Sequence, residues 1–208
     1  PEFQGQFTVD DPLIKTFSAA GLPQPIPEVW AAYFAIEVGD FVIKDIDVAL
    51  SITHTKDSDL EAYLYNPAGD SILLFERVGG SDDNFTNTIF DDQAEVPIAG
   101  GQAPFTGRFQ PEKPLATFNG QNAAGTWYLF VYDSYYGDGG TLDSLQLIFR
   151  AVEADDDQDG LPDTWEMLYL KTLDYGANDD PDGDQLSNAE EYDAYLSGFL
   201  ISPLNPDS

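Results

Sequence analysis

The chain contains no cysteine and a single histidine, His54, among its 208 residues. Without thiols it has no disulfide, no thiolate nucleophile and no zinc–sulfur site. A metal site built from several histidines is excluded as well. The donors that remain are carboxylate, amide and carbonyl oxygens, which are the hard ligands that suit Ca²⁺.

Positive charge is also scarce, because 38 acids oppose 8 bases and give a formal net charge of −30. Such a chain repels nucleic acid and anionic membranes, so we expect neither as a partner. No apolar run approaches the roughly 18 residues of a membrane span. Hydrophobic residues (42%) and aromatics (13%) indicate a globular protein, and the lack of a heptad pattern favours a monomer.

The acids are unevenly distributed, which argues against a purely solubilising role. Residues 153–208 carry 16 acids and one base, whereas residues 1–152 carry 22 acids and seven bases. We therefore predict a lead-in over 1–29, a first domain over 30–152 and an acidic segment over 153–208. The opening Pro1-Glu2-Phe3 is interpreted as a cloning remnant, and the chain as a piece of a longer protein.

The first domain has a β pattern. Residues 42–53 alternate apolar and polar side chains, apart from a slip around Ile43 and Lys44. Further strands are predicted over 60–65, 71–75, 126–132 and 142–149. Turn residues separate these runs, which is typical of an antiparallel sandwich or jelly roll. The proline-rich stretch 91–117 predicts long ordered loops with one short strand.

The acidic segment has a helical period. Two short helices are predicted, over Thr164–Leu173 and Ser187–Ser197. Asp163 or Thr164 is the expected N-cap of the first helix, and Ser187 or Asn188 that of the second.

An acidic loop precedes the first helix. Residues 155–166 (DDDQDGLPDTWE) match the calcium loop of an EF-hand, which uses positions 1, 3, 5, 7, 9 and 12 and a glycine at position 6. Gly160 stands at position 6, and no helix precedes the loop, so a half-hand is favoured over a paired EF-hand. The predicted Ca²⁺ ligands are Asp155, Asp157, Asp159, the Leu161 carbonyl, Asp163 and Glu166.

A second loop in the same register covers residues 180–191 (DPDGDQLSNAEE). Its departure is Gln185 at position 6, which predicts a weaker or slightly reshaped loop. Clustered carboxylates repel one another by several kcal/mol unless a cation joins them, so two copies of this spacing favour calcium sites over a solvated linker. The predicted ligands are Asp180, Asp182, Asp184, the Leu186 carbonyl, Asn188 and Glu191.

These phrases, with SPLNPDS at the end, resemble the calcium repeats of thrombospondin type-3-like and secreted bacterial proteins. Residues 45–149 resemble the P domain of subtilisin-like proprotein convertases and secreted bacterial proteases. The phrases that carry this second resemblance are ITHTKDSDLEAYLYNPAGDSILL, GGSDDNFTNTIFDDQAE and PFTGRFQPEKPLATFNGQNAAGTWYLFVYDSYYGDGGTLDSLQLIF. It implies a mainly β fold, a jelly-roll β-sandwich of the galactose-binding-like kind, with no catalytic role.

The P-domain resemblance also implies calcium in loops at one end of the sandwich. In an antiparallel meander, alternate loops lie at the same end, so we expect the acids of three loops to converge on one ion, against the simpler view that they serve as turn residues and caps. These acids are Asp57, Asp59, Asp82, Asp83, Asp91 and Asp92. Ser58 stands where the family usually has glycine.

Other conspicuous residues are assigned structural roles. His54 is interpreted as a hydrogen-bonded structural histidine, because the chain has no serine-nucleophile motif. Trp30, Trp127 and Trp165 are predicted core residues. The patch Tyr132–Tyr136 is the best candidate for a binding surface, although core packing is the favoured interpretation.

The function predicted from these features is a non-catalytic, calcium-binding accessory module of a secreted serine-type endopeptidase, bacterial and subtilisin-like. Its expected partner is the catalytic domain of the parent protein, and its location is extracellular. The alternative is an extracellular module that binds protein or polysaccharide, with the acidic segment as a calcium-rigidified spacer.

Overall fold

The computed structural model describes residues 14–196 and 202–206, and the chain divides into two compact units, Pro1–Val152 and Glu153–Ser208. The first unit is a β-sandwich and the second contains two short helices. The predicted mainly β fold is confirmed. Residues 1–13 of the predicted lead-in, the predicted helix end at Ser197 and the last two residues lie outside the described part.

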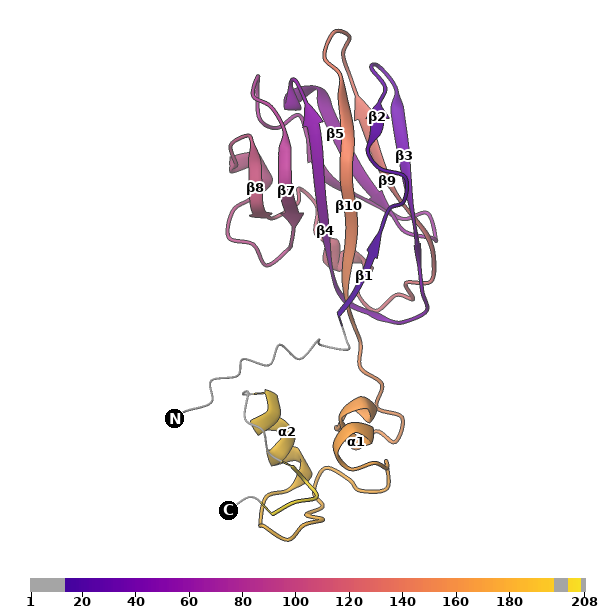
Figure 1. Cartoon of the computed structure of the whole chain (residues 1–208), viewed down its shortest axis with the longest axis vertical. Coiled ribbons are helices and arrows are strands. Elements are labelled where there is room, and N and C mark those ends of the chain that lie inside the picture. Colours follow the sequence, from indigo (N-terminus) through magenta and orange to yellow (C-terminus); the bar gives the residue numbers. More distant parts are fainter. Residues whose placement is uncertain (1–13, 197–201, 207–208) are drawn as a thin grey trace. The chain divides into compact units, whose positions relative to one another are not determined.

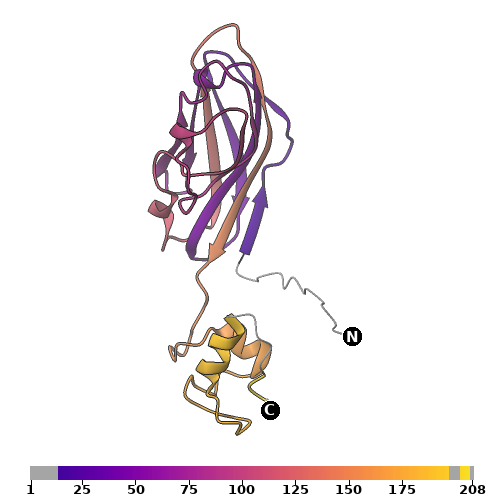
Figure 2. The ribbon, with the colours of Figure 1, turned by 90° about the vertical axis from the view of Figure 1, so that its left-hand side faces the viewer.

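One layer of the sandwich is a six-stranded sheet with the order β1-β10-β4-β7-β8, and β2 also pairs with β10. Figure 1 shows these five strands side by side, and Figure 2 shows the sandwich turned by 90°. All pairs are antiparallel except β7 with β8. The strands are β1 (Ile14–Ser18), β2 (Gln24–Ile26), β4 (Ile43–His54), β7 (Phe85–Phe90), β8 (Phe105–Phe109) and β10 (Gly140–Ala151).

The other layer is a four-stranded antiparallel sheet with the order β3-β9-β5-β6. Its strands are β3 (Ala31–Val38), β5 (Leu60–Tyr65), β6 (Ser71–Glu76) and β9 (Gly125–Asp133). Strands that follow one another in the chain frequently belong to different sheets. The connections therefore cross between layers, unlike those of the simple meander assumed above.

The period-two pattern explains which side chains of β4 face the core. Its side chains at Ile46, Val48 and Leu50 are buried, while the residues between them are partly exposed. The slip in the pattern at Ile43 and Lys44 coincides with an irregularity in the pairing of β4 with β10. Because an extra residue reverses the facing of the side chains, Ile43 is buried and Val42 is 42% exposed.

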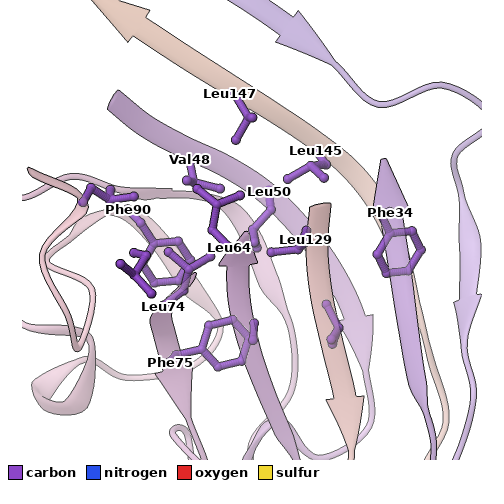
Figure 3. Close-up of a cluster of buried hydrophobic side chains, with 14 of the residues drawn as sticks. Phe34, Val48, Leu50, Leu64, Leu74, Phe75, Phe90, Leu129, Leu145 and Leu147 are labelled. Atoms are coloured by element: carbon purple, nitrogen blue, oxygen red, sulfur yellow. The ribbon is translucent and has the colours of Figure 1, made fainter. Parts of the chain in front are cut away.

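The inner faces of the two sheets form one hydrophobic core. Figure 3 shows Leu64 and Leu129 of one sheet near Val48 and Leu50 of the other. Phe75 stacks against Phe85 at a centroid distance of 4.4 Å. The two sheets therefore share their buried surface, and hydrophobic burial across it is the main stabilising term.

Two sequence predictions about the sandwich need correction. The domain begins before residue 30, since β1 and β2 pair with β10; the turn residues Gly21 and Pro23 masked their short apolar pattern. Trp30 is 71% exposed and is not a core residue, whereas Trp127 and Trp165 are buried as predicted. The stretch 91–117 contains the predicted short strand, β8, and two 3-10 turns, Ile98–Gly100 and Leu115–Phe118.

The second unit has the two predicted helices, α1 (Asp163–Tyr169) and α2 (Asn188–Leu196). A small core of Leu161, Trp165 and Leu170 lies between them, with Tyr192 packed edge-on against Trp165 at 5.4 Å. Within the described residues, neither helix reaches the length that would cross a bilayer.

Candidate metal centre

The first acidic loop brings its carboxylates together in two groups of three that share Asp157. Carboxylate oxygens of Asp155, Asp157 and Asp163 lie within 4.8 Å of one another, as do those of Asp157, Asp159 and Glu166. These five are all the side-chain ligands predicted for this loop. Leu161, predicted to contribute its carbonyl, has its side chain buried in the small core, which fixes the loop to α1.

Backbone amides hold the first loop in this shape. The N–H groups of Asp159 and Gly160 donate to the two carboxylate oxygens of Asp155, both at 3.2 Å. The N–H of Leu161 donates to Asp159 Oδ1 at 2.7 Å. These bonds orient Asp155 and Asp159 but leave most of the loop's negative charge uncompensated. The predicted side-chain N-cap is wrong, because Pro162 occupies the N-cap position of α1 without a side-chain cap.

Glu166 is the most informative residue of the first loop. Its side chain is fully buried, yet neither of its carboxylate oxygens, nor Asp159 Oδ2, has a hydrogen-bond partner in the described structure. Burial, followed by the charges of Asp159 and Asp157, raises the pKa of Glu166 from 4.5 to about 7. A buried carboxylate without a partner is costly, and a bound cation would remove that cost.

The second loop resembles the first in its three aspartates and in the amide bonds to them. Carboxylate oxygens of Asp180, Asp182 and Asp184 lie within 4.8 Å of one another. The N–H groups of Gly183 and Gln185 donate to the two oxygens of Asp180 at 2.7 and 3.1 Å. The N–H of residue 186 donates to Asp184 Oδ1 at 2.8 Å, as that of residue 161 does to Asp159.

Backbone conformation confirms that the loops share one shape. Positions 4 and 6 adopt positive φ in both, with values of 59° and 96° at Gln158 and Gly160, and 78° and 83° at Gly183 and Gln185. Gln185 therefore keeps the backbone conformation that glycine has in the first loop, while the prediction of a weaker second site stays a prediction. Gln185 takes the left-handed conformation of Gly160 at the energetic cost that a side chain carries there.

The remaining ligands predicted for the second loop come from α2. Asn188 and Glu191 are buried. The Asn188 side chain donates from Nδ2 to the Gly176 carbonyl at 2.9 Å, while its Oδ1 is buried without a hydrogen-bond partner. Ser187, one of the two predicted N-cap candidates, is the N-cap: its Oγ accepts from the Glu190 N–H at 3.4 Å, and its own N–H donates to Glu190 Oε2 at 2.9 Å. This reciprocal pairing is a capping box.

The acids of the sandwich do not converge as predicted. Asp91 accepts from Arg108 at 2.5 Å, and Asp92 accepts from the N–H groups of Leu115 and Ala116. Both follow the end of β7, whereas Asp82 and Asp83 precede its start, so the length of the strand separates the two pairs. They serve as an ion-pair partner and a turn cap.

Asp57 and Asp59 are the sandwich acids that remain of interest. Both are buried, and each has one oxygen without a hydrogen-bond partner. Burial and the charges of Asp83 and Asp82 raise the pKa of Asp57 to about 7, although the N–H of Asn84 donates to it at 2.9 Å and lowers it. Asp59 pairs with Lys56 at 2.7 Å. Among the described residues, groups of three close carboxylates occur in the second unit alone.

His54 has the structural role predicted for it, with a partner that the sequence did not indicate. Its Nε2 lies 3.3 Å from Asp133 Oδ2, and both side chains are fully buried. Its Nδ1 accepts from the N–H of Lys56 at 3.1 Å. The pair ties the end of β4 to the end of β9, across the two sheets.

Comparison with known families decides what the sandwich is. The model of the proprotein convertase P-domain matches residues 43–149, just over half of the chain. The chain belongs to the P-domain family. The match starts at β4 and ends in β10, so it covers the core of the first unit.

Solved structures similar to this P-domain chain include the serine protease of Aeromonas sobria. In its complex with the chaperone ORF2, the protease is 19% identical to this chain with a TM-score of 0.43, and the match covers 68% of this chain and 26% of the protease. For the protease without the chaperone, the identity is 18%, the TM-score is 0.43, and the match covers 67% of this chain and 26% of the protease. PfGH50B is 11% identical with a TM-score of 0.33, covering 90% and 29%. The chain thus spans about a quarter of these proteins. No curated protein matches it.

We predict that Gln185→Gly stabilises the second unit by about 1 kcal/mol, since glycine adopts positive φ without a side-chain penalty. Gly160→Ala is the matched change in the first loop, and it should destabilise by a similar amount because its Cβ meets no neighbouring atom within 4 Å and only the backbone is strained. Urea unfolding in chelator measures both. Two effects of the same sign would contradict the shared positive-φ conformation of residues 160 and 185.

The raised pKa of Glu166 predicts a pH effect in the ion-free protein. The folded state binds a proton more tightly than the unfolded state, so folding stability should fall as pH rises from about 4.5 to about 7. Calorimetry of the second unit in chelator should show this decline, and Glu166→Gln should flatten it. A midpoint that rises with pH over this range would contradict the burial of Glu166.

Proposed function

We propose that the chain is a non-catalytic, calcium-binding accessory module of a secreted serine protease of the bacterial subtilisin-like kind. Membership of the P-domain family supports the accessory role and the extracellular location. The observation that carries calcium binding is the fully buried Glu166, whose two oxygens lack hydrogen-bond partners at the centre of an acidic loop.

Ca²⁺ fits the donors of the two loops. It takes six to eight oxygen ligands and tolerates irregular geometry, whereas the chain has no thiolate and a single, buried histidine to offer softer metals. The first loop would hold it through its five carboxylates and the carbonyl of Leu161. The second would use Asp180, Asp182, Asp184, Asn188 and Glu191, with the carbonyl of Leu186. Bound calcium would neutralise these acids and join each loop to the helix that follows.

The proposed calcium sites are confined to the second unit. In the sandwich, Asp91 and Asp92 are occupied by Arg108 and by backbone amides, and Lys56 already compensates Asp59. Within its described residues, the second unit has a small core of three buried hydrophobic residues with a few partly buried ones packed against it. An ion that binds the folded state alone stabilises it. Such an ion would therefore add most to the stability of the second unit, where hydrophobic burial is small.

For the accessory role, the partner is the catalytic domain of the parent protein. The sandwich has an extensive core of its own and buries its histidine in the contact with Asp133, an arrangement that serves the fold. A second candidate function is an extracellular binding module, favoured by aromatic side chains exposed on one face of the sandwich, including Tyr33 and Tyr128.

Calcium should raise the unfolding midpoint of the second unit, measured by calorimetry with calcium and with chelator. The expected gain is about 2.7 kcal/mol per site at a hundredfold excess over the dissociation constant. Glu166→Gln and Glu191→Gln should each remove one site from the calorimetric binding isotherm. Glu95→Gln, an exposed sandwich acid, is the control. A midpoint that is indifferent to calcium would eliminate the metal proposal and leave the P-domain assignment intact.

The accessory role predicts that the parent protease depends on the sandwich. Deleting residues 14–152 from the parent protein should reduce the yield of soluble, active protease several-fold, because a P-domain interface would be lost. Deleting residues 153–208 is the comparison that separates the contribution of the acidic segment. An undiminished yield without the sandwich would contradict the accessory role and favour the binding module.

A further inference from the structure

The outer face of the β3-β9-β5-β6 sheet is unusually rich in aromatic side chains. In β9, Tyr128, Phe130 and Tyr132 alternate with the buried Trp127, Leu129 and Val131, so both faces of this strand are apolar. The register aligns Tyr33, Phe130 and Tyr63 across three strands, and in the next row it aligns Tyr128 with Tyr65. Aromatics in this number facing solvent are costly unless something binds them.

The rings hold one another in place. Phe130 lies at the centre, with ring centroids of Tyr33, Tyr63 and Tyr65 at 5.1, 5.8 and 6.3 Å, all roughly edge-on. These contacts fix the side chains before any ligand arrives, which lowers the entropic cost of binding. Tyr33 is 63% exposed and Tyr128 is 40% exposed, so ring surface remains available.

Part of this face is an open groove of about 350 Å³. In a chain with net charge −30, none of its lining residues is charged. An uncharged lining in so acidic a chain disfavours an anionic ligand. The groove is lined chiefly by Tyr33, Tyr65, Tyr128, Asn66, Pro67 and Thr126.

The hydrogen-bonding groups of the groove further limit the chemical classes of ligand that could bind. The Asn66 amide is already engaged at both ends, donating to Gln121 at 2.8 Å and accepting from the N–H of Asp70 at 2.8 Å. Thr126 donates its proton to Glu37 at 2.6 Å. The tyrosine hydroxyls are the donors that remain, so the groove offers flat apolar walls and a few donors.

We propose that this groove binds proline-rich polypeptide in the polyproline II conformation. Such a segment presents pyrrolidine rings that pack on aromatic walls, and backbone carbonyls that accept hydrogen bonds, while proline has no N–H that needs an acceptor. A neutral oligosaccharide also stacks on aromatic rings, but its many hydroxyls need more free polar partners than Asn66 and Thr126 leave. The proposal does not depend on calcium.

The test is titration of the calcium-saturated chain with a decaproline peptide, followed by amide NMR shifts and calorimetry. Saturable binding is expected, with the largest shifts in β3, β9 and the turn at residues 66–69. Tyr33→Ala and Tyr128→Ala should each weaken binding about tenfold or more. Tyr33→Phe and Tyr128→Phe should weaken binding less than the alanine variants do, since they remove the hydroxyl donor and keep the ring.

Tyr136→Ala is the matched control, because Tyr136 is 81% exposed and does not line the groove. It should bind decaproline like the unmodified chain, and all variants should keep the dispersed amide spectrum of the folded sandwich. The proposal is overturned by the absence of saturable binding, by binding that survives Tyr33→Ala with Tyr128→Ala, or by shifts confined to other surfaces. Binding of cellohexaose in place of decaproline at this face would replace it with a saccharide site.

Discussion

The long antiparallel pairing of β4 with β10 is the contact on which the sandwich depends. It runs from Gly140 opposite His54 to Ala151 opposite Ile43, and β10 also pairs with β1 and β2. A residue larger than glycine does not fit at the Gly140 end of this pairing, because a Cβ there would lie 2.5 Å from both the His54 ring and the Thr53 carbonyl oxygen. His54 in turn contacts Asp133 of the other sheet, so the pairing fixes the layers relative to each other.

The two units are stabilised by different physics. The sandwich buries two apolar faces against each other and needs no ion to do so. The second unit gathers carboxylates around a core of three buried residues, and repulsion among those carboxylates opposes folding. In this unit the backbone amides of both loops orient the acids without neutralising them. Calcium in the proposed sites would replace the repulsion among these carboxylates with attraction between each carboxylate and the ion.

The aromatic face follows from the same strand that builds the core. Successive side chains of a strand point to opposite faces of the sheet. In β9 both sets are apolar, one facing the core and the other facing outward. Its outward residues meet aromatics of both neighbouring strands through cross-strand register. A surface that is rigid and apolar is thus an outcome of how β3, β5 and β9 are aligned.

Local patterns in the sequence were sufficient for β4, β5, β6, β9 and β10, the two helices and both acidic loops, because each depends on residues within a dozen positions of one another, whereas β3 and β7 were not predicted. The same locality explains why the N-cap of α2 was found among the two predicted candidates, Ser187 and Asn188. It also explains two errors. The convergence of six sandwich acids assumed a meander, and the lead-in overlooked β1 and β2, whose pairing partner β10 lies more than a hundred residues away.

What the sequence determined by itself is the mainly β fold, the acidic loops and the character of their oxygen donors, since periodicity and spacing are local properties. Tertiary structure alone decided which acids meet and which are already paired. It brought Arg108 to Asp91 and Asp133 to His54, and it aligned the tyrosines of three strands into one face. Such contacts join distant segments through strand order and register, and no short stretch of sequence encodes either.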